Sequence, residues 1–219
     1  MLQEAAKNLP IGLAGTRVAV QGFGNVGSWA ARLLHENGCR VVAVSDVKGG
    51  VYRPGGLDIP KLLEYDKANQ TVVGFPGGDS ITNAELLELE CDLLVPAAID
   101  KVITAKNSPQ VKAKVILEAA NHPLTPEADV ILQDRGIIVL PDILVNAGGV
   151  IVSYFEWTQN LQEFSWEEAQ VNQELRKIMA RAYQEVHKKV VAEGITYREA
   201  AFEIGVARVA RAVELRGFV

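Results

Sequence analysis

The chain has 219 residues, of which 48% are hydrophobic and 22% charged, values that are typical of a globular protein and unlike disordered, collagen-like or coiled-coil chains. Its 22 basic and 27 acidic residues give a net charge of −5, which offers no basic surface for a polyphosphate, so nucleic acid is not an expected partner. No apolar run approaches the roughly 18 residues of a membrane span, and the N-terminus does not resemble a signal peptide. We therefore expect a cytoplasmic protein that binds no membrane.

Five short apolar runs in the first two thirds of the chain are predicted to be β-strands. They are Arg17–Gln21, Arg40–Ser45, Asp92–Pro96, Lys114–Glu118 and Ile137–Leu140. Most are continuously apolar, as in parallel strands that are buried on both faces. Helical patterns lie between them, so the chain is predicted to be an α/β protein with a doubly wound, mostly parallel, Rossmann-like sheet.

Apolar spacing and capping patterns predict the helices that connect these strands. The first has the apolar stripe Val26, Trp29, Ala30, Leu33 and Leu34 and ends at Gly38. Thr82 with Glu85 forms a capping box, and Thr125 before Pro126 marks another helix start. The glycine-rich stretch from Lys48 to Glu90 predicts turns around one short helix near Ile59–Lys67.

Beyond Pro141 the pattern becomes purely helical. Ser165 with Glu168 predicts the start of a long helix that ends at Gly194, and Thr196 with Glu199 predicts a second helix that ends near Gly217. The long helix has the apolar stripe Val171, Leu175, Ile178, Ala182, Val186 and Val190. We expect residues 1–165 to form a dinucleotide-binding Rossmann-like domain and residues 166–219 a C-terminal helical appendage packed on it. Cys39 and Cys91 are expected to be core thiols, since two distant cysteines suggest neither a disulfide framework nor a metal cluster.

The strongest local signal is the segment Val18–Gly27, in which a predicted strand leads through G-x-G-x-x-G into a helix. In such a turn Gly22 permits a tight bend, Gly24 lets a pyrophosphate approach the backbone, and Gly27 lets helix and strand pack closely. Asp46 ends the second predicted strand, where a carboxylate can accept hydrogen bonds from the adenosine ribose. The pattern predicts a dinucleotide site; the alternative is a merely structural glycine turn.

Small or amide residues follow the other predicted strands, where ligands of open α/β sheets bind. They are Pro96-Ala97-Ala98, Asn121 and Asn146-Ala147-Gly148-Gly149. Asparagine amides both donate and accept hydrogen bonds, which suits a nicotinamide carboxamide or a ribose hydroxyl, and the alanines leave room for a flat cofactor. The alternative is that Asn121 and Asn146 are ordinary turn residues. No histidine has acidic or thiol neighbours at ligand spacing, so no metal site is expected.

Four strings resemble the nucleotide-binding half of glutamate dehydrogenase, in the Glu/Leu/Phe/Val dehydrogenase family. They are Val20-Gln-Gly-Phe-Gly-Asn-Val-Gly27, Leu94-Val-Pro-Ala-Ala98, Glu118-Ala-Ala-Asn-His-Pro-Leu-Thr-Pro-Glu-Ala-Asp129 and Leu140-Pro-Asp-Ile-Leu-Val-Asn-Ala-Gly-Gly-Val-Ile-Val-Ser-Tyr-Phe-Glu-Trp157. The last string is the most specific, because related leucine, phenylalanine and valine dehydrogenases usually lack its Ser-Tyr-Phe-Glu-Trp continuation. One departure is Ala119-Ala120-Asn121-His122, where the family more often has Gly-Ala-Asn-Gly.

The resemblance implies oxidative deamination of L-glutamate to 2-oxoglutarate and ammonium, with hydride transfer to a nicotinamide. It implies roles for residues that hold the pyrophosphate (Gly22, Phe23, Gly24, Asn25, Val26, Gly27), the adenosine ribose (Asp46), the nicotinamide ribose (Ala97, Ala98, Asn121), the carboxamide (Asn146) and the substrate (Val150, Ser153). The alternative for Ser153 is a buried helix serine bonded to a carbonyl one turn back. Asp46 favours NAD over NADP because its charge repels a 2′-phosphate, although Lys48 could neutralise that phosphate.

The family's acid–base lysine and aspartate lie in an N-terminal substrate domain that has no counterpart here. No catalytic residue is therefore expected in this chain, which is expected to fold, to bind the cofactor weakly and to be inactive alone. The intact enzyme is expected to be a homo-oligomer. Two alternatives are the cofactor domain of a related leucine, phenylalanine or valine dehydrogenase and a stand-alone nucleotide-sensing module.

Overall fold

The computed structural model describes residues 1–217, which form two compact units. One unit is Ala6–Asp142, and the other combines Met1–Ala5 with the residues from Ile143 onward. The division into a dinucleotide-binding domain of residues 1–165 and a helical appendage of residues 166–219 stays a prediction.

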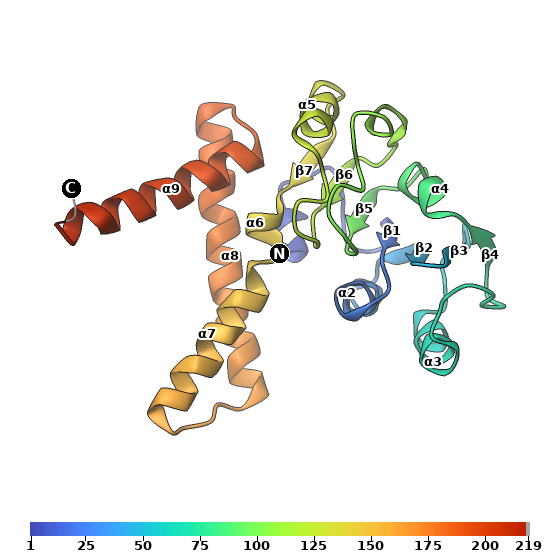
Figure 1. Cartoon of the computed structure of the whole chain (residues 1–219), viewed down its shortest axis with the longest axis horizontal. Helices are drawn as coiled ribbons and strands as arrows, with labels where there is room; N and C mark the ends of the chain where they lie inside the picture. The colour runs from blue at the N-terminus through green and yellow to red at the C-terminus, as the bar shows by residue number, and fades with distance from the viewer. Residues whose placement is uncertain (218–219) are drawn as a thin grey trace. The chain divides into compact units, whose positions relative to one another are not determined.

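The unit Ala6–Asp142 contains a sheet in the order β4-β3-β2-β1-β5-β6-β7 within the described residues (Figure 1). Its strands are β1 (Arg17–Gln21), β2 (Arg40–Asp46), β3 (Gly49–Tyr52), β4 (Asp79–Ile81), β5 (Leu93–Pro96), β6 (Val115–Leu117) and β7 (Ile138–Leu140). The five strands from β2 through β1 to β7 are mutually parallel, whereas β3 and β4 are paired antiparallel. This confirms the predicted α/β, mostly parallel, Rossmann-like fold.

Helices cover both faces of this sheet (Figure 1). On one face lie α2 (Asn25–Glu36) and α3 (Ile59–Asn69), and on the other lie α4 (Asn83–Leu87), α5 (Pro126–Asp134) and the short 3-10 helix Ser108–Gln110. The α4 and α5 side encloses a core cluster of buried apolar residues that includes Ala19, Leu94, Ile116 and Leu132. Helices α4 and α5 begin at the predicted caps Thr82 and Thr125, and Cys39 and Cys91 are buried free thiols as predicted.

The prediction of turns around one helix between Lys48 and Glu90 is wrong in one respect. Besides α3, the stretch contains the strands β3 and β4, which extend the sheet beyond β2 as an antiparallel edge. These strands are short, and β3 begins with Gly49 and Gly50. Glycine lowers strand propensity, so pairing with the edge of β2, rather than the local sequence, determines this structure.

The buried face of α2 also differs from the prediction. Val26, Trp29 and Leu33 are all at least half exposed, whereas Gly27, Ala31 and Leu34 face the sheet. Apolar residues with helical spacing lie on two sides of α2. Because α2 packs closely against β1, the side with the smaller residues faces the sheet. Trp29 instead lies under the guanidinium of Arg32, 5.0 Å from its ring centre.

Asp92, directly before β5, links the amino ends of three strands. Its Oδ2 accepts hydrogen bonds from the backbone N–H of Arg17 at 2.9 Å and from the Arg17 Nε at 3.3 Å, and its Oδ1 pairs with the Lys114 Nζ at 2.9 Å. Burial opposes the charged form of this carboxyl, but the basic and N–H donors outweigh burial and lower its pKa to about 2.

This pKa predicts how the contribution of Asp92 to stability depends on pH. A carboxyl whose pKa is lower in the folded than in the unfolded state stabilises the fold above the unfolded value, near 3.9, and loses that contribution as the pH falls toward about 2. We expect Asp92→Asn to cost about 1–2 kcal/mol in unfolding free energy at about pH 6 and almost nothing at about pH 2. Urea unfolding of both proteins across this range measures the difference; a pH-independent difference would contradict the prediction.

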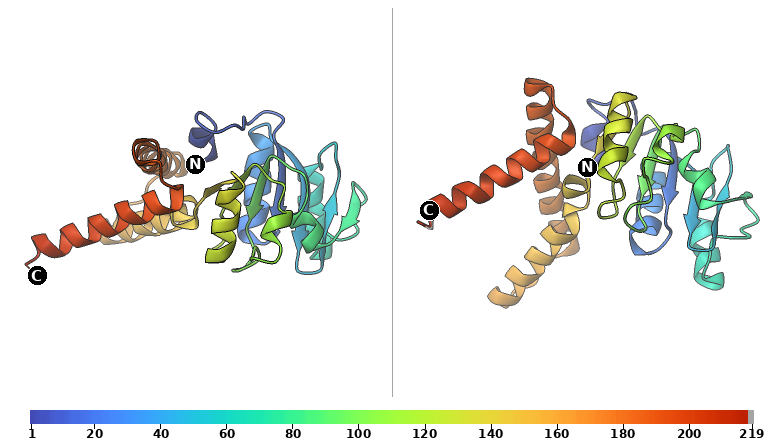
Figure 2. Two further views of the ribbon diagram at one scale, coloured as in Figure 1. Left: turned by 90° about the horizontal axis from the view of Figure 1, so that it is seen from above. Right: turned by 45° about the horizontal axis from the view of Figure 1, so that its top comes forward.

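The second unit is helical and consists of α1 (Leu2–Ala5), most of α6 (Asp142–Val145), α7 (Ala147–Gln162), α8 (Glu168–Glu193) and α9 (Tyr197–Leu215). Helix α8 packs against α7, α9 and α1, and Figure 2 shows α9 leaving α8 at the Gly194 turn. No helix of the described residues has both the length and the apolar composition that crossing a membrane requires.

Two predictions about this helical unit need correction. Helix α8 begins at Glu168 after Glu167, with no side-chain cap, so Ser165 does not start it. Its buried side chains are Met179, Tyr183 and Val186, so of the predicted stripe only Val186 is fully buried. The predicted capping box of Thr196 with Glu199 is confirmed at the start of α9.

Candidate functional site

The candidate site lies at the carboxyl ends of the parallel strands in the unit Ala6–Asp142. From β1 the chain crosses through α2 to β2 on one side, and it later returns to place β5 on the other side of β1. Gln21, the last residue of β1, lies opposite Ser45 of β2 and Pro96 of β5. This is the point of reversed strand order at which open α/β sheets bind ligands.

The turn between β1 and α2 depends on glycine at its first position. Gly22 has a φ of +99°, and a Cβ there would lie 2.8 Å from the Ala98 Cβ and 2.9 Å from the Ala97 carbonyl oxygen. The Ala97 N–H donates to the Gln21 carbonyl at 2.7 Å, which fixes the two strand ends together. The structure thus brings the predicted residues Gly22, Ala97 and Ala98 into contact.

Gly24, unlike Gly22, has open space where a side chain would lie. It is the N-cap of α2 with a φ of −76°, and a Cβ built there would meet no atom within 4 Å. No side chain caps this helix, so the first N–H groups of α2, from Asn25 onward, are directed to open space beside an exposed backbone. Such an N-terminus favours an anion, and a pyrophosphate fits the space that a Cβ would fill.

Gln21 is a site feature that sequence analysis did not identify. Its side chain is only 6% exposed, yet its Oε1 is buried with no hydrogen-bond partner. Buried polar atoms are normally paired, so an unpaired one directly before the glycine turn is unusual. The unpaired amide oxygen is an acceptor and fits a hydrogen-bond donor such as a hydroxyl group, whereas the open space at Gly24 fits an anion. A polar residue directly after the three apolar residues of β1 was the available signal.

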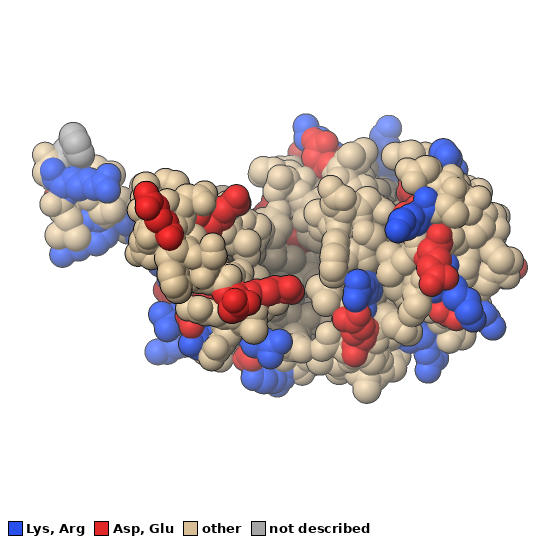
Figure 3. Space-filling view, turned by 90° about the horizontal axis from the view of Figure 1, so that it is seen from below, with Lys and Arg blue, Asp and Glu red and all other residues tan. Residues whose placement is uncertain are grey.

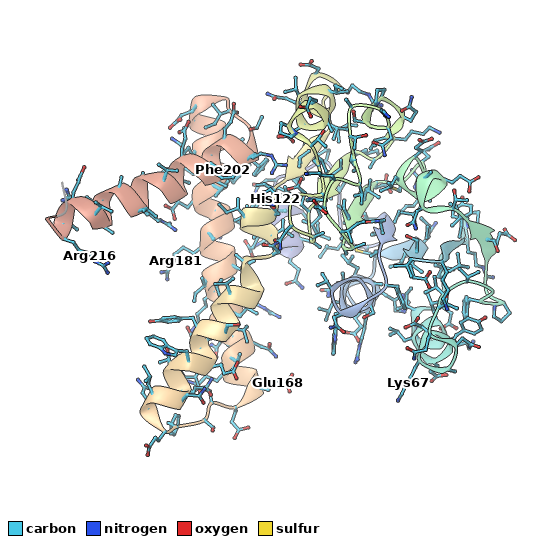
Figure 4. The ribbon with its side chains drawn as sticks, in the orientation of Figure 1. Lys67, His122, Glu168, Arg181, Phe202 and Arg216 are labelled. Carbon is cyan, nitrogen blue, oxygen red and sulfur yellow. The ribbon has the colours of Figure 1, made fainter. Side chains whose placement is uncertain are left out.

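The loop after β6 lies beside the end of β5. The N–H groups of Ala119 and Ala120 both donate to the Pro96 carbonyl, at 3.0 and 2.9 Å, which places Asn121 at the same edge of the sheet. His122 has a φ of +46°, in the left-handed region that favours glycine (Figure 4). The left-handed turn that glycine favours is therefore kept despite the histidine.

Two acidic residues, also missed by sequence analysis, fix this loop. Glu118 is fully buried, and its Oε2 accepts a hydrogen bond from the Asp142 N–H at 2.8 Å. The Asp142 Oδ2 in turn accepts a hydrogen bond from the His122 N–H at 2.8 Å. These bonds tie the loop that carries Asn121 to the end of β7.

The carboxylate of Asp46 is already fully hydrogen-bonded within the protein. Its Oδ1 accepts from the N–H groups of Lys48 at 2.6 Å and Gly49 at 3.2 Å. Its Oδ2 accepts from the Thr71 Oγ1 at 2.5 Å and the Val72 N–H at 2.8 Å. Burial opposes ionisation, but these four hydrogen bonds outweigh it and hold the pKa of Asp46 below its usual value. Asp46 therefore connects the β2–β3 turn to the segment after α3.

The remaining predicted residues, Asn146, Val150 and Ser153, belong to the helical unit. Asn146 is the N-cap of α7 and makes no side-chain cap bond, Val150 is 76% exposed, and Ser153 is exposed on the same helix. The alternative of a buried serine at position 153 is therefore wrong. The roles implied for these three residues stay predictions.

The seven-strand sheet and the glycine turn at its point of reversed strand order define the class of this protein, a Rossmann-like α/β protein. The sequence model of the Glutamate/Leucine/Phenylalanine/Valine dehydrogenase family matches residues 1–217. The chain belongs to this family, and membership implies the use of a nicotinamide cofactor, NAD or NADP.

Individual proteins that are similar to this chain are also amino-acid dehydrogenases. The chain is 53% identical over 201 residues to a glutamate dehydrogenase of Thermotoga maritima, a match that covers 91% of the chain and 48% of the relative. A hetero-hexameric glutamate dehydrogenase from Thermus thermophilus superposes with a TM-score of 0.91 at 35% identity, over 98% of this chain and 51% of that one. An L-tryptophan dehydrogenase from Nostoc punctiforme superposes with a TM-score of 0.71 at 25% identity, over 96% of this chain and 57% of that one. The chain thus spans about half the length of these relatives.

Proposed function

We propose that this chain is the cofactor-binding part of a glutamate dehydrogenase, which oxidatively deaminates L-glutamate to 2-oxoglutarate and ammonium with NAD, or alternatively NADP, as cofactor. The observation that carries the proposal is the β1–α2 turn, where the open backbone at Gly24 precedes an uncapped helix N-terminus. The matches to glutamate dehydrogenases support this substrate over the related amino acids. When bound, the nicotinamide would supply the hydride acceptor.

The residues of the turn would bind and orient the cofactor. The backbone from Gly22 to Gly27 would receive the pyrophosphate, because the N–H groups of α2 point out of a surface that carries no side chain at Gly24. Ala97, Ala98 and Asn121 line the same edge of the sheet and would flank the nicotinamide ribose. Asn146 would hold the carboxamide, and Val150 and Ser153 would contact the substrate.

The intact protein would be a cytoplasmic homo-oligomer in which an additional substrate domain supplies the acid–base residues. The present chain would bind cofactor without carrying out the reaction.

Gly24→Ala tests the site. A Cβ at this position would meet no protein atom but would occupy the space proposed for the pyrophosphate, so we expect NADH affinity to fall about tenfold or more while the fold is kept. Fluorescence or calorimetric titration with NADH measures the affinity, and circular dichroism checks the fold.

Gly12→Ala is the matched control, because Gly12 lies on the loop before β1 and likewise has no atom within 4 Å of a built Cβ. It should leave NADH affinity unchanged. If the unsubstituted chain binds neither NADH nor NADPH at millimolar concentration, or if Gly24→Ala binds as tightly as the unsubstituted chain, the proposal is wrong.

A further inference from the structure

We propose that Lys48 recognises the 2′-phosphate of NADP, so that the chain accepts both cofactors, and that Asp46 positions the Lys48 loop instead of contacting the ribose itself. This inference rests on the proposed function, because it concerns the adenosine end of the same cofactor site.

The carboxylate of Asp46 has no acceptor position left for a ligand. A carboxylate offers about four lone-pair directions, and all four are used here by the N–H groups of Lys48, Gly49 and Val72 and by the Thr71 hydroxyl. A ribose hydroxyl could bind Asp46 only by displacing one of these donors. The side chain therefore acts by fixing the β2–β3 turn against residues 71 and 72.

The same turn presents a cation. The Lys48 Nζ donates to the Gln70 carbonyl at 3.3 Å, next to the two residues that bind Asp46. An ammonium group has three donors, and among the described residues Lys48 forms no ion pair, so its charge is available to an anion. The loop that Asp46 fixes thus carries a positive charge two residues after the end of β2.

A hollow beside this turn has room for a phosphate. It has a volume of about 380 Å³ and is lined by Val47 to Gly50 on one side and by Ser80 to Asn83 on another. Lys48 and the exposed Ser80 can contribute hydrogen-bond donors to an anion there. The hollow lies at the carboxyl end of β2, the strand next to the glycine turn.

Three carboxylates near this turn oppose an anion, and two of them accept hydrogen bonds from neighbouring groups of the protein. Asp46 is surrounded by its four donors. Glu85 lines the hollow, but its Oε2 accepts two hydrogen bonds from Thr82, at 2.8 and 2.7 Å. Asp66 lies on α3, where burial and the charge of Asp46 raise its pKa. Lys48 is therefore the charge best placed to decide whether a 2′-phosphate binds.

The test compares ligands that differ only in the 2′-phosphate. NADPH and NADH form one such pair, and 2′,5′-ADP and 5′-AMP form another that needs only the adenosine end. We expect the chain to bind all four and Lys48→Gln to weaken NADPH and 2′,5′-ADP about tenfold while changing NADH and 5′-AMP by less than twofold. Lys48→Arg should retain the affinity for the phosphorylated ligands.

Lys112→Gln is the control for charge. Lys112 precedes β6 at the amino edge of the sheet, so this variant should change none of the four affinities. The inference fails if Lys48→Gln changes the affinities for both ligands of a pair equally, or changes neither of them. It also fails if the chain binds NADH but not NADPH. If none of the four ligands binds, the proposed function fails as well.

A second variant tests the positioning role of Asp46. In Asp46→Asn an amide NH₂ group replaces one carboxylate oxygen, so that a donor faces the hydrogen-bond donors that this oxygen accepts from. This variant should therefore lower the thermal unfolding midpoint by several degrees. An unchanged midpoint together with a tenfold loss of NADH affinity would show that the carboxylate contacts the ribose directly, and would overturn this part of the inference.

Discussion

Replacing Gly27 by alanine should severely destabilise the unit Ala6–Asp142. A Cβ at Gly27 would lie 1.8 Å from the Gly22 carbonyl oxygen and 2.6 Å from its carbon, so the backbone of the turn or of α2 must move. Gly27 also faces the sheet on the buried side of α2, so that movement separates the helix from β1. We expect a loss of about 3 kcal/mol or more. For a chain of this length, such a loss lowers the unfolding midpoint by about 6–12 °C.

Gly24→Ala, three residues earlier, is the matched comparison for this experiment. Both variants add one methyl group to the same motif, but nothing lies within 4 Å of the Cβ built at Gly24. Calorimetric melting should therefore show a large shift for Gly27→Ala and none for Gly24→Ala, whereas cofactor titration at low temperature should show Gly24→Ala impaired. Equal melting temperatures for the two variants would contradict the roles that we assign to these glycines.

The second large effect is the expected absence of glutamate oxidation by this 219-residue chain. It spans about half the length of the relatives that it matches, and the proposed acid–base groups belong to the other half. Proton transfer by a positioned side chain contributes about 10²–10⁴-fold to a rate. Hydride transfer further needs the two reacting atoms held about 3–3.5 Å apart, which contributes several more orders of magnitude.

Absorbance of the reduced nicotinamide, followed with L-glutamate over a range of NAD concentrations, measures this activity. The glutamate dehydrogenase of Thermotoga maritima serves as the positive control. Any turnover in the preparation must be compared with Gly24→Ala purified in the same way. Turnover with an unchanged KM for NAD in this variant comes from a contaminant, whereas turnover whose KM for NAD the substitution raises would show that the chain carries its own acid–base residues.

The sequence predicts the glycine turn well because its determinants are local. Gly22, Gly24 and Gly27 lie within six residues, and each has a distinct steric reason that follows from the motif itself. The parallel strands were predictable for a similar reason, since burial on both faces makes each of them continuously apolar. Their observed bounds differ from the predicted ones by a single residue or none at either end.

The features that were missed depend on partners that are distant in the sequence. Asp46 ends β2 as predicted, but two of its donors come from residues 71 and 72, after an intervening helix. Sequence spacing could not show that these donors occupy the carboxylate. The buried face of α2 was mispredicted because the close packing at Gly27 favours Ala31 over the larger Trp29 on the side facing the sheet.

The pairing of β1 with β5 has a consequence for the order in which this protein folds. The strands come together from opposite ends of a long segment, as the bond from the Arg17 N–H to Asp92, 75 residues away, illustrates. Closing such a loop is slow, whereas β2, β3 and β4 follow one another along the chain and can pair early. The contacts of Gly22 with Ala97 and Ala98 exist only after β5 has joined. We therefore expect the proposed ability to hold a nucleotide to be acquired late on the folding pathway, and partly assembled chains to lack it.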